Sequence, residues 1–118
     1  MLTYLRSIAF AILANLWTWS LVVLFLPLLA LPRRQLQWCA ALWCRGVVGL
    51  ARVICGIRYR VVGRENLPQG PAIFAAKHQS AYDTVIFHVI LDDPVFVLKR
   101  ELLQVPLFGL YLKTLGNI

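Results

Sequence analysis

The sequence contains few charged residues and very few acidic ones. Only 14% of its 118 residues are charged, with five Asp and Glu against twelve Lys and Arg, whereas 60% are hydrophobic. Soluble domains average about 25% charged and about 45–50% apolar residues. This composition excludes a disordered chain and argues against a freely soluble globular protein.

Cysteine is also scarce, and no Cys-x-x-Cys pair is present. The three cysteines, Cys39, Cys44 and Cys55, lie within one apolar stretch. An odd number without paired spacing argues against a disulfide framework, and a zinc site needs more ligands than this stretch offers. We therefore expect buried thiols in a reducing compartment and no metal site.

A long uncharged run begins near the start of the chain. It extends from Ser7 to Pro32, and fourteen of residues 8–31 are Leu, Ile, Val or Phe. A helix needs about 20 apolar residues to cross a bilayer, whereas the apolar core of a signal peptide has about 7–15. We therefore predict a membrane-anchoring helix and not a cleaved signal peptide. Trp17 and Trp19 lie inside the run, which leaves open whether the helix spans the bilayer or lies in one leaflet.

A second apolar stretch follows at residues 35–57. Read as a helix, it carries two arginines and two glycines in one narrow stripe. The arginines suit a helix in the membrane interface, where they reach towards phosphate headgroups, and the glycines suit packing against another helix. We expect residues 1–57 to form a two-helix, hairpin-like membrane anchor. The stripe consists of Arg45, Gly49, Arg52 and Gly56.

The arginines are distributed asymmetrically. Seven lie between residues 33 and 64 with no acidic residue before Glu65, whereas Arg6 is the only charged side chain ahead of the apolar run. Positive residues favour the cytoplasmic side of a membrane. We therefore expect an inner-membrane protein whose residues after Pro32 face the cytoplasm and meet membrane phospholipid. Nucleic acid is not an expected partner, because the basic residues are interleaved with apolar segments and no recognition module is present.

The pattern changes at Arg58, and residues 58–118 predict a second domain of the α/β class. Short apolar runs bounded by turn residues favour strands. Three-and-four spacing after Ser80, ended by Asp92-Asp93-Pro94, predicts a helix. Strand and helix in alternation are typical of an α/β layered fold. The expected strands are 58–62, 72–76 and 95–98, and short helical pieces are expected at 101–103 and 108–115.

One segment after the second expected strand carries candidate chemistry. His78 is followed five residues later by Asp83, at the start of the expected helix. A catalytic histidine needs one free ring nitrogen, and a carboxylate commonly holds its other N–H. Ser80 and Asp83 also match the capping box that begins many helices, so the spacing alone leaves a structural role for Asp83 open. His88, on an otherwise apolar helix, is expected to be structural.

Three sequence blocks occur in order after Arg58. They are Gly63-Arg64-Glu65-Asn66-Leu67-Pro68, then Lys77-His78-Gln79-Ser80-Ala81-Tyr82-Asp83, then Leu98-Lys99-Arg100-Glu101-Leu102 with Pro106-Leu107-Phe108-Gly109. Together they resemble the glycerolipid acyltransferase family and, within it, the bacterial 1-acylglycerol-3-phosphate acyltransferases. The H-x-x-x-x-D element alone is a weak signal, but the ordered set behind a membrane anchor is specific.

The resemblance implies a reaction and roles for three residues. The reaction is transfer of an acyl group from acyl-CoA or acyl-carrier protein to the sn-2 hydroxyl of lysophosphatidic acid, which gives phosphatidic acid. His78 would be the general base and Asp83 would orient it. Lys99 would contact the substrate phosphate, a role that suits an ammonium point charge. The resemblance implies no cofactor beyond the thioester substrate.

The chain departs from the family pattern in three respects, one of which is Leu110, where the family often has tryptophan after the Pro106–Gly109 block. Lys77 stands where the family commonly has asparagine, and the family's later Phe-Pro-Glu-Gly-Thr-Arg block is absent before the chain ends at Ile118. The resemblance therefore implies a C-terminally truncated chain with an incomplete sheet and with weak or no activity of its own. Two alternatives stay open. One is an acyltransferase for another lysolipid, and the other is a non-enzymatic membrane adaptor.

Overall fold

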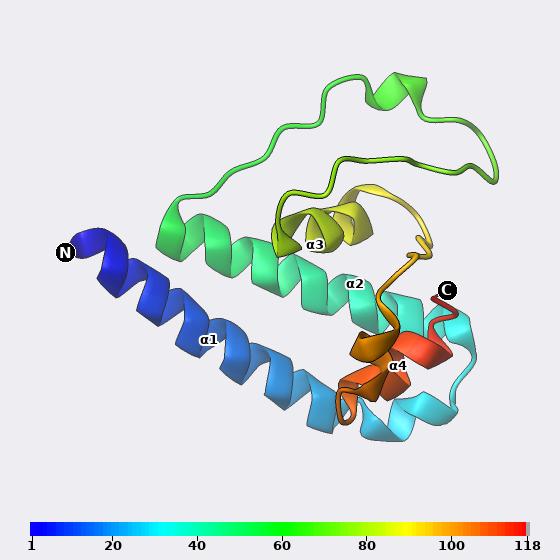
Figure 1. The fold of residues 1–118 in the computed structure, drawn as a ribbon, viewed down its shortest axis with the longest axis horizontal. Coiled ribbons are helices and arrows are strands. Elements are labelled where there is room, and N and C mark those ends of the chain that lie inside the picture. The colour runs from blue at the N-terminus through cyan, green and yellow to red at the C-terminus, as the bar shows by residue number, and fades with distance from the viewer. Residues whose placement is uncertain (118) are drawn as a thin grey trace.

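The computed structural model describes residues 1–117, and every regular element in that range is helical. Two long helices come first, and two shorter helices follow after an extended loop (Figure 1). The α-helices are α1 (Leu2–Leu24), α2 (Arg33–Leu50), α3 (Ala81–Ile90) and α4 (Phe108–Thr114). Short 3₁₀ turns lie at η1 (Leu26–Ala30), η3 (Arg64–Asn66) and η4 (Arg100–Gln104), and a π-helical turn, η2 (Ala51–Cys55), extends α2.

The two predicted N-terminal helices are present and lie antiparallel, as an α-hairpin (Figure 1). Hydrogen bonds from two tryptophans connect one helix to the other. The indole N–H of Trp17 donates to the carbonyl oxygen of Trp43 at 3.2 Å, and the indole N–H of Trp43 donates to Thr18 Oγ1 at 2.9 Å. The second helix ends at Gly56, whose φ of 73° lies in the left-handed region that glycine adopts without steric cost. Trp17, inside the first apolar run, and Trp43 of the second helix therefore join the two helices, whereas Trp19 is exposed.

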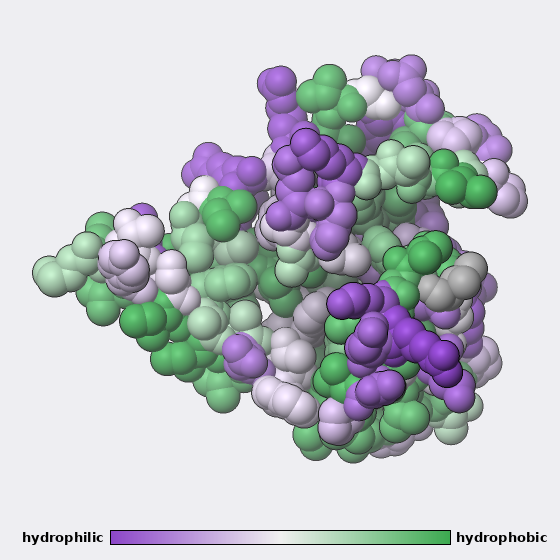
Figure 2. Space-filling view, in the orientation of Figure 1, coloured by the Kyte–Doolittle hydropathy of each residue, from purple (hydrophilic) through white to green (hydrophobic). Residues whose placement is uncertain are grey.

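Both helices of the hairpin are long and apolar enough to cross a membrane, by length and composition. Hydrophobic side chains cover the surface over α1, whereas hydrophilic ones gather over the loop between α2 and α3 and over the region of α4 (Figure 2). An exposed apolar surface of this extent is typical of a membrane or protein contact. The exposed apolar side chains of α1 include Leu5, Ile8, Ile12, Leu16, Trp19 and Val23.

The core of the described structure is small and lies along α2. Leu36 and Cys44 are the largest side chains that are fully buried there, and Cys39 is buried beside them. Cys55 is half-buried, and the three thiols are free. The prediction of buried, unpaired thiols is therefore confirmed for Cys39 and Cys44, whereas Cys55 keeps partial exposure.

The predicted α/β sheet is wrong for residues 1–117. None of the expected strands at 58–62, 72–76 and 95–98 forms; these segments are irregular, without a ladder of backbone hydrogen bonds. A strand is stabilised by its neighbours, because its N–H and C=O groups pair only across a ladder. Val62, Ile73 and Val97 instead expose between 77% and 99% of their surface. Their apolar composition resembles a strand, but nothing in the described structure covers or pairs them.

The predicted helices after residue 80 are present. The α3 helix begins after Ser80 and ends before the Asp92-Asp93-Pro94 segment, as expected. It packs on α2 (Figure 1). The α4 helix lies at the other end of the hairpin, where the hydroxyl of Tyr111 donates to the carbonyl oxygen of Val22 at 2.8 Å. Residues 58–117 are thus held to the hairpin by α3 and α4.

Candidate active site at the start of α3

His78 and Asp83 lie together at the N-terminal end of α3. The ring nitrogen Nδ1 of His78 is 3.5 Å from Asp83 Oδ2. Four residues lie between them in sequence, and the turn that enters α3 brings the imidazole close to the first turn of the helix. The separation is longer than a hydrogen bond of about 2.7–3.2 Å, and contacts of this kind in enzymes often shorten only when a substrate binds.

The same carboxylate oxygen of Asp83 also accepts two backbone N–H groups. Gln79 donates at 2.7 Å and Ser80 at 2.9 Å, and Ser80 and Asp83 form a capping box. These two amide hydrogen bonds are the main reason that the pKa of Asp83 lies below its ordinary value, and the nearby His78 lowers the pKa further. The contact with His78 and the capping box thus use the same carboxylate, which stays ionised near neutral pH.

The imidazole of His78 is open to an incoming molecule. Its side chain is 69% exposed, whereas that of Asp83 is 30% exposed. Because Nδ1 faces the carboxylate, Nε2 is the nitrogen that faces away, and no hydrogen bond to it occurs within residues 1–117. A histidine held in this way can take a proton from a bound hydroxyl group.

Lys99 is not brought into this site by the described structure. It is the exposed residue that precedes η4, at the other end of the segment that follows α3. No ion pair or hydrogen bond of its side chain is present within the described range. Its predicted contact with a substrate phosphate therefore stays a prediction.

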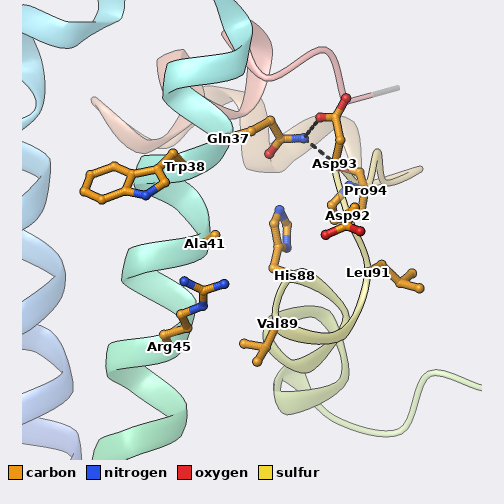
Figure 3. A pocket seen from close by; sticks show the side chains of 10 residues that line it. All are labelled: Gln37, Trp38, Ala41, Arg45, His88, Val89, Leu91, Asp92, Asp93 and Pro94. Carbon is orange, nitrogen blue, oxygen red and sulfur yellow. Dashed lines mark hydrogen bonds between the residues drawn. The ribbon is translucent and has the colours of Figure 1, made fainter. Parts of the chain in front are cut away.

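His88 lies at the opposite end of α3 from His78 and makes structural contacts. Its ring stacks on Phe96 with centroids 4.7 Å apart and planes 22° apart, and Nδ1 is 3.3 Å from the carbonyl oxygen of Thr84. Burial lowers the pKa of His88, because the charged imidazolium loses hydration. A cavity of about 160 Å³ adjoins His88 between α2 and α3 (Figure 3), away from the His78–Asp83 pair.

A polar cluster near that cavity was not expected from the sequence. Asp93 Oδ2 forms an ion pair with Arg33 Nη1 at 2.7 Å, and Asp93 Oδ1 accepts from Gln37 Nε2 at 2.7 Å. Arg33 and Gln37 lie four residues apart and therefore share one face of α2. That spacing is the only sequence signal for the cluster, and the sequence does not show that Asp93 is its partner.

A family model described as Acyltransferase matches residues 58–118, just over half of the chain, including the His78–Asp83 pair. The chain belongs to the acyltransferase family. The matched region begins at Arg58, where the extended loop leaves the hairpin anchor. The site at the start of α3 is accordingly the candidate active site of a family member.

Curated relatives extend the similarity over the two N-terminal helices as well. A 1-acyl-sn-glycerol-3-phosphate acyltransferase of Pseudomonas aeruginosa is 36% identical over 97% of this chain and 45% of its own length. A protein of the same name from Saccharomyces cerevisiae is 30% identical over 98% of this chain and 38% of its own length. Lysophospholipid acyltransferase LPCAT4 of Homo sapiens is 31% identical over 90% of this chain and 21% of its own length.

The chain spans less than half the length of each of these relatives. No solved structure matches it. The similarity in sequence therefore establishes the family, while the arrangement of the site comes from the geometry described above.

Proposed function

We propose that the protein transfers an acyl group from acyl-CoA or acyl-carrier protein to the sn-2 hydroxyl of 1-acylglycerol-3-phosphate. The observation that carries the proposal is the His78–Asp83 pair, 3.5 Å apart, exposed at the start of α3 in a member of the acyltransferase family. The names of two relatives support lysophosphatidic acid as the acceptor. The product is phosphatidic acid.

In the proposed mechanism His78 acts as a general base. Asp83 orients the imidazole through Nδ1 and stabilises its charged form, so Nε2 takes the proton of the acceptor hydroxyl. The hydroxyl oxygen attacks the carbonyl carbon of the thioester, the carbon–sulfur bond breaks, and the leaving thiolate takes the proton back from the imidazolium. The acyl group passes directly to the acceptor without an intermediate bonded to the protein.

Lys99 is the proposed contact for the acceptor phosphate. A phosphomonoester carries up to two negative charges, and an ammonium group binds it as a point charge. Lys99 is exposed and flanked by Arg100, so this segment presents two cations. This role rests on the position of Lys99 in the family pattern.

The membrane anchor suits a reaction whose acceptor and product are both lipids. We place the protein in the inner membrane with the candidate site on the cytoplasmic side, where soluble thioester donors are present. The seven arginines between residues 33 and 64 support this orientation. The exposed apolar surface of α1 supports membrane contact.

The test is thioester-dependent acylation of lysophosphatidic acid by the intact protein in lipid vesicles. General base catalysis contributes about 10²–10⁴-fold to a rate, so His78→Ala should lower kcat by at least that range. Gln79→Ala is the matched control, because only the backbone of Gln79 contacts Asp83. Turnover of His78→Ala close to that of the unmodified protein would remove His78 from the mechanism.

A second acceptor class has specific support. The human relative is named a lysophospholipid acyltransferase, and it matches 90% of this chain. An assay that offers lysophosphatidic acid, lysophosphatidylcholine and lysophosphatidylethanolamine at equal concentration would decide between them. If kcat/KM were larger for lysophosphatidylcholine or lysophosphatidylethanolamine, that lysolipid would become the proposed acceptor, and the proposed role of His78 would stay the same.

A further inference from the structure

The cluster of Arg33, Gln37 and Asp93 joins the membrane anchor to the helix that carries the candidate site. Arg33 Nη1 and Gln37 Nε2 each contact one carboxylate oxygen of Asp93 at 2.7 Å. Gln37 Nε2 also donates to the carbonyl oxygen of Pro94 at 2.9 Å (Figure 3), and Arg33 Nε donates to that of Leu115 at 2.7 Å. Two residues of α2 therefore hold both the end of α3 and the end of α4.

The hydrogen bonds of this cluster are the most directional contacts that hold α3 on the hairpin. No residue of α3 is buried, although the helix is in contact with α2. Apolar contact between two surfaces is not directional, so it fixes the orientation of a half-buried helix only weakly. The bonds to Asp93, three residues beyond Ile90, are directional and hold the C-terminal end of α3 in one place.

Asp93 has a backbone conformation that the cluster maintains. Its φ of 52° is in the left-handed region, which aspartate and asparagine tolerate better than most residues. The side chain then points back towards α2 and meets both Arg33 and Gln37. The contacts of Arg33 and Gln37 with Asp93 therefore fix the conformation of the turn that follows α3.

We propose that Arg33 and Gln37 are positioning residues that set the height and tilt of the His78–Asp83 pair relative to the lipid surface, an inference that rests on the proposed function. The ten residues of α3 extend about 15 Å, and the candidate site lies at the end away from the cluster. A tilt of about 10° at the cluster moves the far end by about 2–3 Å. Misplacement by about 1 Å can cost about 10²-fold in rate.

The activity test compares two acceptors in the intact protein. Arg33→Gln removes the bonds to Asp93 and Leu115, whereas Arg34→Gln removes a neighbouring exposed cation and serves as the control. With lysophosphatidic acid embedded in vesicles, kcat/KM of Arg33→Gln should fall at least about tenfold. With a short-chain, monomeric lysophosphatidic acid it should fall less than about twofold, since that acceptor reaches the site from water. Arg33→Lys should recover most of the vesicle rate.

A second measurement is independent of catalysis. An environment-sensitive fluorophore on Gln79→Cys, in a background with the three native cysteines changed to alanine, reports the depth of the site in vesicles containing quencher lipids. Quenching should change in Arg33→Gln and in Gln37→Leu but not in Arg34→Gln.

The outcomes separate this inference from the proposed function. Equal losses with both acceptors together with a lower Tm, or unchanged quenching, would overturn the positioning role. A protein that acylates no lysolipid would overturn the proposed function, and the quenching measurement would still decide whether the cluster sets the depth of the site.

Discussion

The oxygen Oδ2 of Asp83 lies 3.5 Å from Nδ1 of His78 while it also accepts the N–H groups of Gln79 and Ser80. The backbone bonds hold the carboxylate still, because the helix start and the side chain fix one another. Because this carboxylate is already held in place, it loses little further conformational entropy when it orients an imidazole. The helix start therefore supplies the rigidity that the proposed general base needs.

Replacement of Asp83 by asparagine distinguishes the role of its negative charge from its role as the cap of α3. Asp83→Asn keeps a side-chain oxygen that can accept the two N–H groups, but it removes the negative charge opposite His78. We expect kcat to fall by about 10²–10⁴-fold with the helix retained. The measurement is acyl transfer together with circular dichroism of the intact protein. Asp92→Asn, at the other end of α3, is the control, and an equal loss in both variants would contradict an orienting role for Asp83.

The proposed contact of Lys99 with the acceptor phosphate predicts a change in KM. A hydrogen bond to a charged group contributes about 1.5–3 kcal/mol, so Lys99→Ala should raise KM for lysophosphatidic acid about 10–100-fold. Its KM for 1-acylglycerol, which lacks the phosphate, should stay the same. Lys113→Ala, an exposed cation on α4, is the matched control. A decrease in kcat alone would argue against phosphate binding by Lys99.

The half-buried environment of His88 predicts a dependence of stability on pH. Its pKa in the folded protein lies below the ordinary value of 6.5, so the unfolded chain binds the proton more readily. This contribution to the free energy of unfolding is complete above pH 6.5 and declines as the pH falls through the folded-state pKa. His88→Phe keeps an aromatic ring against Phe96 and cannot titrate. Denaturant unfolding in micelles at pH 8.0 and pH 5.5 should therefore show a smaller pH effect in this variant, and an equal effect would exclude His88 as the cause.

The elements that the sequence predicts correctly are those with local causes. The hairpin helices follow from long apolar runs, and α3 follows from Ser80, Asp83 and the three-and-four spacing between them and Asp92-Asp93-Pro94. Strand predictions at residues such as Ile73 failed because a strand also needs a partner, and a short apolar run does not specify one.

The contacts in and around the candidate site likewise include some with local causes and some that depend on distant residues. The His78–Asp83 pair lies within one turn of chain, so its proximity follows from local structure. The ion pair of Arg33 with Asp93 joins residues 60 positions apart, and such a contact depends on how α3 lies on α2. Composition and periodicity do not contain that information.

The contact between Trp17 and Gly46 predicts that adding one methyl group at Gly46 lowers the stability of the hairpin. A Cβ added at Gly46 would lie 2.3 Å from the indole of Trp17, a ring that donates to Trp43 and therefore has little freedom to move. Gly46→Ala should lower the free energy of unfolding of the hairpin by about 1–3 kcal/mol.

Gly49 supplies the matched control for that substitution. It lies on the same helix with nothing within 4 Å of an added Cβ, and alanine is favoured over glycine in a helix interior by about 1 kcal/mol. Gly49→Ala should therefore be neutral or stabilising in the same denaturation experiment. If both variants behaved alike, the close approach of the two helices at Trp17 would not hold in solution. A loss confined to Gly46→Ala would show that the glycine is present to admit the indole ring, because helix propensity acts in the opposite direction at both positions.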